Sequence, residues 1–381
     1  MQAQRPRAED EVVRPAEVSE DAILRVLRVP PEAAGTRLDR FVQRELRNTS
    51  RTRSQLIISR GAYDAHGRRL RKNQRLAAEQ RVVLWREALD EEPLERELAV
   101  LYEDEHLLAV DKPPLVTVHP TARLHRSTLV KLLERQRPDE HLTLAHRLDR
   151  ETSGVLVLAR TRAADRLVKA QFEERSGVVK RYLALAWGWP EWQQYRCELA
   201  IEPDLACSYR VKMRAVSAAD AALPGAAADG SIDPFADRSS DWIDAHGRRA
   251  RRLPAATSFE LCGRRRSAQT GRAYSLLRCT LHTGRQHQIR VHLAALGLPV
   301  VGDKLYGPDE TLFPRGADGE LTAEDFAVLE LPRHALHAES LELDHPIDGR
   351  RLRIEAPFPP DLAAFWDALV PAGPPDLPDS L

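Results

Sequence analysis

The sequence predicts an α+β protein: a small N-terminal α/β module, then a larger domain on a mixed, mostly antiparallel sheet flanked by helices and loops. The chain has 381 residues, more than one typical domain contains. Short strand-like segments follow one another across polar turns, with few helical patterns between them. Basic residues are concentrated near the N-terminus. These three observations together favour a charged module attached to a sheet-based body.

The charge is unevenly distributed although the whole chain is formally neutral, with 57 basic and 57 acidic residues. Residues 37–86 contain fourteen Lys or Arg and four Asp or Glu, a net charge of +10. The rest of the chain therefore carries −10, since the total is zero. A basic module on an acidic body indicates a dedicated contact with a polyanion.

The overall composition, 43% hydrophobic and 30% charged, is that of an ordinary soluble protein. No apolar run approaches the roughly 18 residues of a membrane span, and the N-terminus lacks the apolar core of a secretory signal. We therefore expect a cytoplasmic protein without a membrane partner, and favour a monomer. The cysteines show no CxxC pairing, which argues against a zinc knuckle or a disulfide framework.

The basic module is predicted over residues 21–86, between a disordered tail at 1–20 and an acidic linker at 87–97. A short strand is expected from Ala22 to Val29. Apolar residues at helical spacing around 38–46 and 56–57 then predict two short helices. A hairpin should follow, turning at His66-Gly67.

The larger domain is predicted over residues 98–370, followed by a disordered tail at 371–381. A segment at about 215–256, rich in Ala, Asp, Gly, Pro and Ser, is expected to be a loosely structured insertion. Strands are predicted on both sides of the turn at 103–105 and over 142–148, 154–159, 178–188, 255–262, 274–281, 333–346 and 351–359. Helices are predicted over 126–137 and 163–174, up to about 296 in the TGRQHQIRVHLAALG segment, and over 361–369.

The stretch from Leu142 to Arg160, LTLAHRLDRETSGVLVLAR, places one carboxylate, Asp149, in a polar loop between two apolar strands. Rigid scaffolds tend to present reactive groups on such loops. Taken alone, the loop is better explained as a solvated hairpin tip in which Asp149 starts a turn. Its interpretation therefore depends on the other motifs.

Read in order, the larger domain contains DKPPLVTVHP (111–120), HRLDRETSG (146–154), KRYLALAWG (180–188), TGRQHQIRVH (283–292), GDKLYG (302–307) and RHALHA (333–338). This series closely resembles the ordered motifs of the RluA-type RNA pseudouridine synthases. These isomerases move the attachment of selected uracils from nitrogen 1 to carbon 5 of the ring. The basic module resembles the alpha-L RNA-binding module of a ribosomal small-subunit protein, over about residues 36–83.

The resemblance implies that Asp149 is the catalytic carboxylate, with Arg290 as its ionic partner and Tyr182 against the extruded base. Asp149 could attack the sugar, add to carbon 6 of the ring or remove the ribose 2′ proton, and the sequence leaves all three open. Arg147 is expected to fill the place of the flipped base, since its planar cation can stack there. Ile289 should supply a nearby apolar contact.

The same resemblance implies an RNA partner, with large-subunit ribosomal RNA favoured over transfer RNA because a basic module suits a large folded substrate. Phosphate contacts are expected from Arg37, Arg51, Arg53, Arg68, Arg69, Arg71 and Lys72. No cofactor and no metal are expected. His282, His287 and His292 recur every five positions, which does not match zinc spacing, so they are interpreted as structural.

Two features depart from the family pattern. Leu115 stands where the family usually has Gly, so this strand end could bend differently, and the insertion is longer than the pattern requires. A non-catalytic RNA-binding assembly factor with the same fold is the alternative function, and it predicts that Asp149, Tyr182 and Arg290 do not converge. A metal-dependent nuclease is a more distant alternative, because no paired carboxylates or His/Cys ligand cluster appear.

Overall fold

The computed structural model describes residues 12–19, 22–46, 51–86, 93–120, 126–174, 177–207, 209, 211–216, 241–243 and 249–372. These residues form two compact units, one ending at residue 86 and one beginning at residue 93. Each unit has its own hydrophobic core. The other residues of the predicted tails, linker and insertion lie outside this description.

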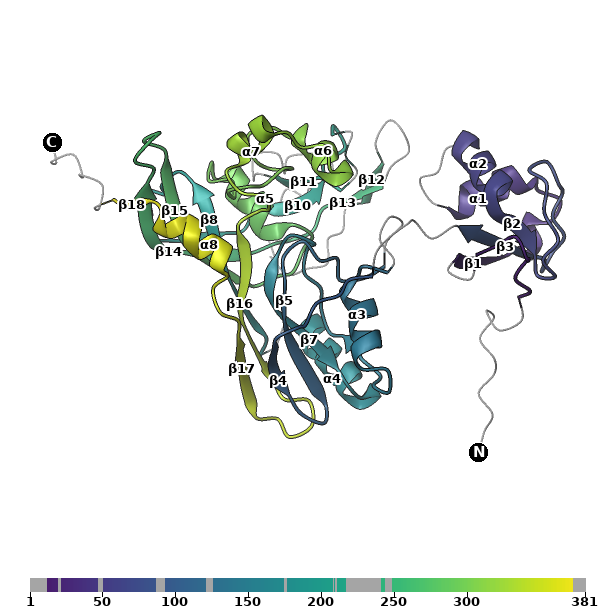
Figure 1. The fold of residues 1–381 in the computed structure, drawn as a ribbon, viewed down its shortest axis with the longest axis horizontal. Coiled ribbons are helices and arrows are strands. Elements are labelled where there is room, and N and C mark those ends of the chain that lie inside the picture. The colour runs from purple at the N-terminus through teal and green to yellow at the C-terminus, as the bar shows by residue number, and fades with distance from the viewer. Residues whose placement is uncertain are drawn as a thin grey trace, which may run out of the picture. The chain divides into compact units, whose positions relative to one another are not determined.

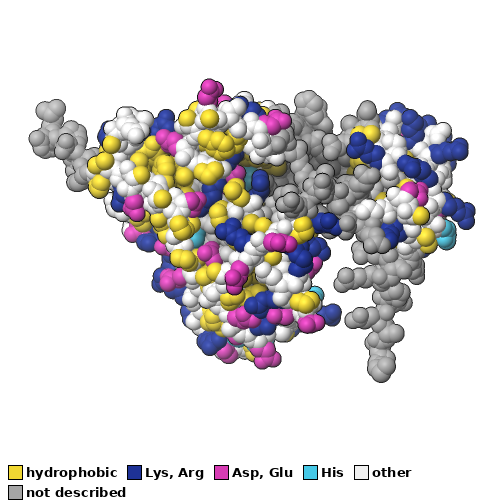
Figure 2. Space-filling view, in the orientation of Figure 1, with side chains coloured by type: hydrophobic (Ala, Val, Ile, Leu, Met, Phe, Trp, Pro, Cys, Tyr) yellow, Lys and Arg dark blue, Asp and Glu magenta, His cyan; other side chains and the backbone are white. Residues whose placement is uncertain are grey.

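The N-terminal unit packs two helices against an antiparallel sheet of strand order β1-β3-β2. Its elements are β1 (Ile23–Arg28), the 3-10 turn η1 (Pro31–Ala33), α1 (Leu38–Glu45), α2 (Arg51–Gly61), β2 (Ala62–Asp64) and β3 (Arg81–Arg86) (Figure 1). The apolar residues of α1 are buried because their spacing places them on one face. The predicted turn closes where Gly67 donates to the carbonyl of Asp64. Figure 2 shows Lys and Arg side chains gathered over the visible face of this unit.

Residues 12–19 differ from the predicted disordered tail. The amide of Val13 donates to the carbonyl of Ala65 at 3.0 Å, and the hydroxyl of Tyr63 donates to Glu17 at 3.3 Å. These two contacts hold the segment against the hairpin of the N-terminal unit.

The larger unit is organised around one sheet that contains eleven of the described strands, in the order β18-β14-β15-β8-β16-β7-β5-β4, with β17, β6 and β9 attached at β16, β7 and β14. All its pairings are antiparallel except that of β16 with β7, which confirms the predicted mixed, mostly antiparallel sheet. The strands are β4 (Val100–Glu103), β5 (Leu107–Lys112), β6 (Thr143–Leu144), β7 (Ser153–Ala159), β8 (Val179–Trp187), β9 (Gln194–Cys197), β14 (Thr257–Arg266), β15 (Ala273–Leu281), β16 (Leu336–Asp344), β17 (Arg351–Glu355) and β18 (Val370–Pro371).

Helices and two small sheets complete this unit (Figure 1). The helices are α3 (Leu129–Gln136), α4 (Arg162–Glu174), α5 (Gln288–Ala295), α6 (Leu312–Asp318), α7 (Ala323–Leu329) and α8 (Pro360–Asp367). The two-stranded sheets pair β10 (Ala200–Pro203) with β11 (Met213–Val216) and β12 (Asp241–Ile243) with β13 (Arg249–Arg251). The core contains both faces of β7, because its alternating side chains are all buried.

Several elements differ from their predictions. The strand predicted over 142–148 is reduced to β6, because the side chain of His146 accepts the amide of Val157 at 3.1 Å and displaces a backbone partner. The described parts of the insertion include the paired strands β12 and β13, and Pro371 pairs with β14 instead of starting a disordered tail. Helices α6 and α7 were not predicted.

Leu115 adopts a left-handed backbone conformation with φ of +65°. This conformation is usual for glycine and uncommon for a branched residue. Leu115 therefore occupies a backbone conformation to which glycine is better suited, and a different bend at this strand end stays a prediction.

Candidate active site

A pocket of about 540 Å³ opens in the larger unit, a volume within the usual range for small-molecule sites. Its walls come from the segment before β7, the end of α4, β8, and the turn that leads into α5. Five predicted site residues line it: Arg147, Asp149, Tyr182, Ile289 and Arg290. The fold thus gathers at one place residues that are more than 140 positions apart in the chain.

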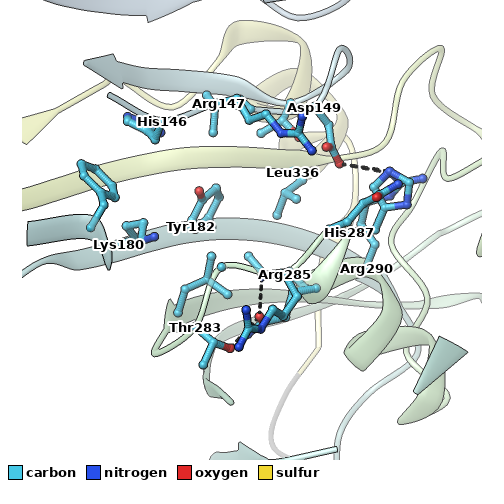
Figure 3. A pocket seen from close by; sticks show the side chains of 18 of the residues that line it. His146, Arg147, Asp149, Lys180, Tyr182, Thr283, Arg285, His287, Arg290 and Leu336 are labelled. Atoms are coloured by element: carbon cyan, nitrogen blue, oxygen red, sulfur yellow. Dashed lines mark hydrogen bonds and ion pairs between the residues drawn. The ribbon is translucent and has the colours of Figure 1, made fainter. Parts of the chain in front are cut away.

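Asp149 lies in the irregular segment between β6 and β7, where the amide of Thr152 donates to the Asp149 carbonyl at 3.2 Å. Its side chain is 35% exposed, so the carboxylate is reachable from the pocket. Figure 3 shows this carboxylate facing Arg290 and His287, which come from the start of α5. Arg290 Nη1 donates to Asp149 Oδ2 at 3.3 Å.

Arg290 is held rigidly by a second carboxylate. Its Nε and Nη2 donate to the two oxygens of Asp303 at 2.6 and 2.8 Å, and Asp303 is fully buried. Burial acts to lower the pKa of Arg290, but the Asp303 carboxylate outweighs it, so the pKa is raised and the side chain stays charged. The ring of Tyr306 lies 5.0 Å from the guanidinium carbon. Arg290 therefore presents one fixed N–H group to Asp149.

Tyr182 and Ile289 form an apolar part of the pocket wall. Tyr182 lies on β8 and is 8% exposed, and Ile289 is 3% exposed. Burial, followed by the negative charge of Asp149, raises the pKa of the Tyr182 hydroxyl. The phenol is therefore protonated at neutral pH and offers a flat face suited to a planar ring.

Arg147 and His146 take different directions from the same segment (Figure 3). Arg147 is exposed and lines the pocket. The ring of His146 stacks on Phe172 with centroids 5.1 Å apart. Burial, and then the charge of Lys180, lower the pKa of His146 to about 3. A neutral His146 can accept the amide of Val157, so it ties the segment to β7.

The loop that carries Asp149 is held in place by residues that are far from it in the sequence. Glu151 accepts hydrogen bonds from Lys304 Nζ at 2.9 Å and from the amide of His334 at 2.8 Å. Thr152 Oγ1 lies 2.8 Å from His334 Nε2. Arg333 Nη1 donates to the Glu151 carbonyl at 3.3 Å. These contacts fix the two loop residues that follow Arg150.

Lys112, at the end of β5, supports the loop from another side. Its fully buried ammonium group donates to the carbonyls of Pro113, Val116 and Arg150 at 2.8, 2.9 and 3.1 Å. Burial, followed by the charge of Arg333, lowers the pKa of Lys112 to about 7. The KPPL motif thus has a structural role that sequence reasoning did not assign.

His287, interpreted from sequence as structural, lies in the pocket. Its Nε2 is 3.9 Å from Asp149 Oδ2, and its Nδ1 is 2.9 Å from the hydroxyl of Tyr306. Its backbone is left-handed, with φ of +57°. Sequence reasoning also missed Asp303, although the run GDKLYG, with charged residues between two glycines, was a usable signal.

The predicted phosphate-binding residues lie in the N-terminal unit and differ in how free they are. Arg37 and Arg51 both donate to Asp39, which is fully buried. Arg69 donates to the carbonyl of Ser59. Arg68, Arg71 and Lys72 are exposed, and their side chains have no ion pair among the described residues. Arg53 lies in α2, but its side chain is outside the description.

Among the described residues no group of three or more His, Cys, Asp and Glu is arranged to hold a metal ion. None of the described helices is both long and apolar enough to cross a bilayer. The pocket combines the accessible carboxylate of Asp149, the fixed guanidinium of Arg290, the phenol of Tyr182 and the exposed side chain of Arg147. Such a set can hold a flat polar ring beside a nucleophile or base.

A sequence model of the RNA pseudouridylate synthase family matches residues 106–295. The chain is 35% identical to a ribosomal large subunit pseudouridine synthase D of Xanthomonas campestris, covering 92% of this chain and 93% of the relative. It is 31% identical to the protein of the same name in Pseudomonas aeruginosa, over 90% and 94% of the two chains. Among solved structures, human RNA pseudouridylate synthase domain containing 1 aligns with a TM-score of 0.51 and 27% identity, over 74% of this chain and 92% of that one.

Proposed function

The chain belongs to the RluA-type RNA pseudouridine synthases and is an isomerase, and from this premise we propose that it converts specific uridines of large-subunit ribosomal RNA to pseudouridine, using Asp149 and no cofactor. The observation that carries the proposal is the contact of Asp149 with Arg290 in the wall of a pocket that Tyr182 and Arg147 also line. A carboxylate beside a fixed guanidinium is held ready for reaction at the sugar or the ring. The names of the bacterial relatives support the choice of RNA.

The target uracil must leave its stack before it can enter the pocket, at a cost of a few kcal/mol. Arg147 is exposed at the pocket and close in sequence to Asp149, and we assign it to the vacated place in the RNA. Stacking on an aromatic ring contributes roughly 1 to 3 kcal/mol per base. Tyr182, with Ile289 beside it, can therefore offset much of the flipping cost.

The N-terminal unit supplies the proposed grip on the rest of the RNA. Arg68, Arg71 and Lys72 extend from the hairpin of this unit and have no protein anion to satisfy them among the described residues. Lys and Arg side chains that neutralise phosphates release the counterions bound to the RNA, which favours binding. Folded ribosomal RNA offers a larger phosphate surface than transfer RNA, which favours it as the substrate.

The alternative, an assembly factor without turnover, predicts that Asp149, Tyr182 and Arg290 lie apart, whereas all three line one pocket. The deciding experiment maps pseudouridine in total RNA from cells with and without the protein. We expect one or a few large-subunit uridines to lose the modification and to regain it when the gene is restored. An unchanged pseudouridine map, together with a defect in ribosome assembly in the cells without the protein, would support the assembly factor instead.

A further inference from the structure

The side chain of His287 lines the pocket but has no part in the roles proposed for Asp149, Tyr182 and Arg290. It is 13% exposed and lies between Tyr306 and Asp149. Its strained backbone conformation, left-handed at the residue before α5, directs the imidazole into the pocket (Figure 3). Strain of this kind persists where surrounding contacts hold it, often at functional sites.

The hydrogen bonds of Tyr306 determine which ring nitrogen of His287 carries the proton. The amide of Met213 can only donate, and it donates to the Tyr306 oxygen at 2.9 Å. The hydroxyl hydrogen of Tyr306 therefore needs another acceptor, and His287 Nδ1 lies 2.9 Å away. A buried hydroxyl that fails to donate costs about 1 to 3 kcal/mol. Tyr306 thus donates to Nδ1, and a neutral imidazole in this arrangement carries its hydrogen on Nε2.

The ring is neutral under ordinary conditions. Burial, and then the charge of Arg290, lower the pKa of His287 to about 4. The carboxylates of Asp149 and Asp303 act in the opposite direction but do not outweigh them, and Arg147 adds to the lowering. His287 Nε2 therefore presents an N–H group toward Asp149 Oδ2, at 3.9 Å, too long for a direct hydrogen bond.

We propose that His287 is a further catalytic residue, a neutral imidazole whose Nε2–H donates to a carbonyl oxygen of the uracil. This inference rests on the proposed function. In each of the three routes open to Asp149, the bond between the ribose carbon and uracil nitrogen 1 breaks and its electron pair goes to the base. The charge spreads over nitrogen 1 and the carbonyl oxygens. A preorganised donor beside the carboxylate stabilises this charge as it develops, as oxyanion-hole donors do.

Two substitutions separate this role from a merely structural one. In His287→Gln the amide NH₂ occupies roughly the place of Nε2–H, so a donor to the pocket remains. In His287→Asn the shorter amide mimics Nδ1, so it can still accept from Tyr306 but offers no donor near Asp149. Asn also tolerates the left-handed backbone better than Gln does. A purely structural role therefore predicts that Asn is the better replacement.

The test is single-turnover pseudouridine formation on the mapped RNA, with RNA affinity and thermal unfolding measured on the same proteins. We expect His287→Asn to lose about a hundredfold in rate at saturating enzyme, the usual effect of removing one such donor, with RNA affinity changed less than threefold. His287→Gln should retain at least ten times the activity of the Asn variant. Equal rates for the two variants, or a faster Asn variant, would overturn the proposal.

A second readout does not depend on turnover. The ¹⁵N chemical shifts of His287 in the full chain should show an unprotonated Nδ1 and a protonated Nε2. In Tyr306→Phe, which removes the donor to Nδ1, the two forms should become mixed. A protonated Nδ1 in the wild type would refute the assignment of the proton. If the wild type formed no pseudouridine but showed the expected shifts, the proposed function would fail and the proton assignment would remain.

Discussion

Removal of the three free cations of the N-terminal hairpin tests whether the basic unit holds RNA by its phosphates. The variant is Arg68→Ala, Arg71→Ala and Lys72→Ala together. These side chains are exposed and have no ion pair among the described residues, so their loss should leave folding unchanged. Each phosphate contact contributes about 0.7 to 0.9 to the slope of log affinity against log salt. Three lost contacts should therefore make the slope shallower by about 2 to 3.

The assay is fluorescence anisotropy with a labelled ribosomal RNA fragment between 50 and 300 mM salt. A charge control comes from the larger unit, where Arg162 and Arg166 are exposed on α4, and the double Ala variant should change the slope by less than 1. Arg37→Ala is a folding control: it should lower the unfolding temperature, because Arg37 holds the buried carboxylate of Asp39. An unchanged slope in the triple variant would refute the phosphate-binding argument.

Three further predictions concern the larger unit. Gly154→Ala should lower the free energy of unfolding by about 3 kcal/mol or more, because the new Cβ would lie 2.2 Å from the Ala338 carbonyl oxygen. The control Gly271→Ala, which has open space around it, should cost about 1 kcal/mol. Similar costs for the two variants in denaturant titrations would contradict the close approach of Gly154 to Ala338. The pKa of Lys112 is lowered from 10.5 to about 7, so between these pH values the unfolded chain binds more protons than the folded chain and stability rises with pH. Relative to Lys112→Met, the free energy of unfolding of the wild type should increase by on the order of 4 kcal/mol between pH 7 and 10. Parallel pH profiles of stability for the two proteins would rule this out. Arg147→Ala should lose more activity on duplexed than on single-stranded targets, and equal losses would count against its role in flipping.

The parts of the fold with local patterns could be predicted from the sequence. The spacing of Leu38, Phe41 and Val42 gave α1, and the continuous apolar run from Val155 to Ala159 gave β7. The strand predicted through His146 was wrong because apolar residues there satisfy a strand pattern, while a side-chain hydrogen bond to Val157 interrupts the backbone pairing. Such a bond has no signature in periodicity.

The site was predictable only where a motif stood for it. Asp149, Tyr182 and Arg290 came from motif resemblance, and their common pocket depends on strand pairings that join residues far apart in sequence. The support of Arg290 by Asp303 and of Glu151 by Lys304 is likewise long-range. Charged residues of this kind resemble ordinary surface residues in the sequence, because their burial appears only when the chain is folded.

The catalytic role proposed for Asp149 is tested most directly by the activity of Asp149→Asn on ribosomal RNA labelled with tritium at carbon 5 of uridine. Attachment of carbon 5 to the ribose displaces that hydrogen, so tritium release reports each turnover. We predict that the variant binds RNA within about threefold of the wild type and releases no tritium above background, since the amide shape is retained and the carboxylate is lost. Release at a rate near that of the wild type would show that Asp149 does not carry the reaction.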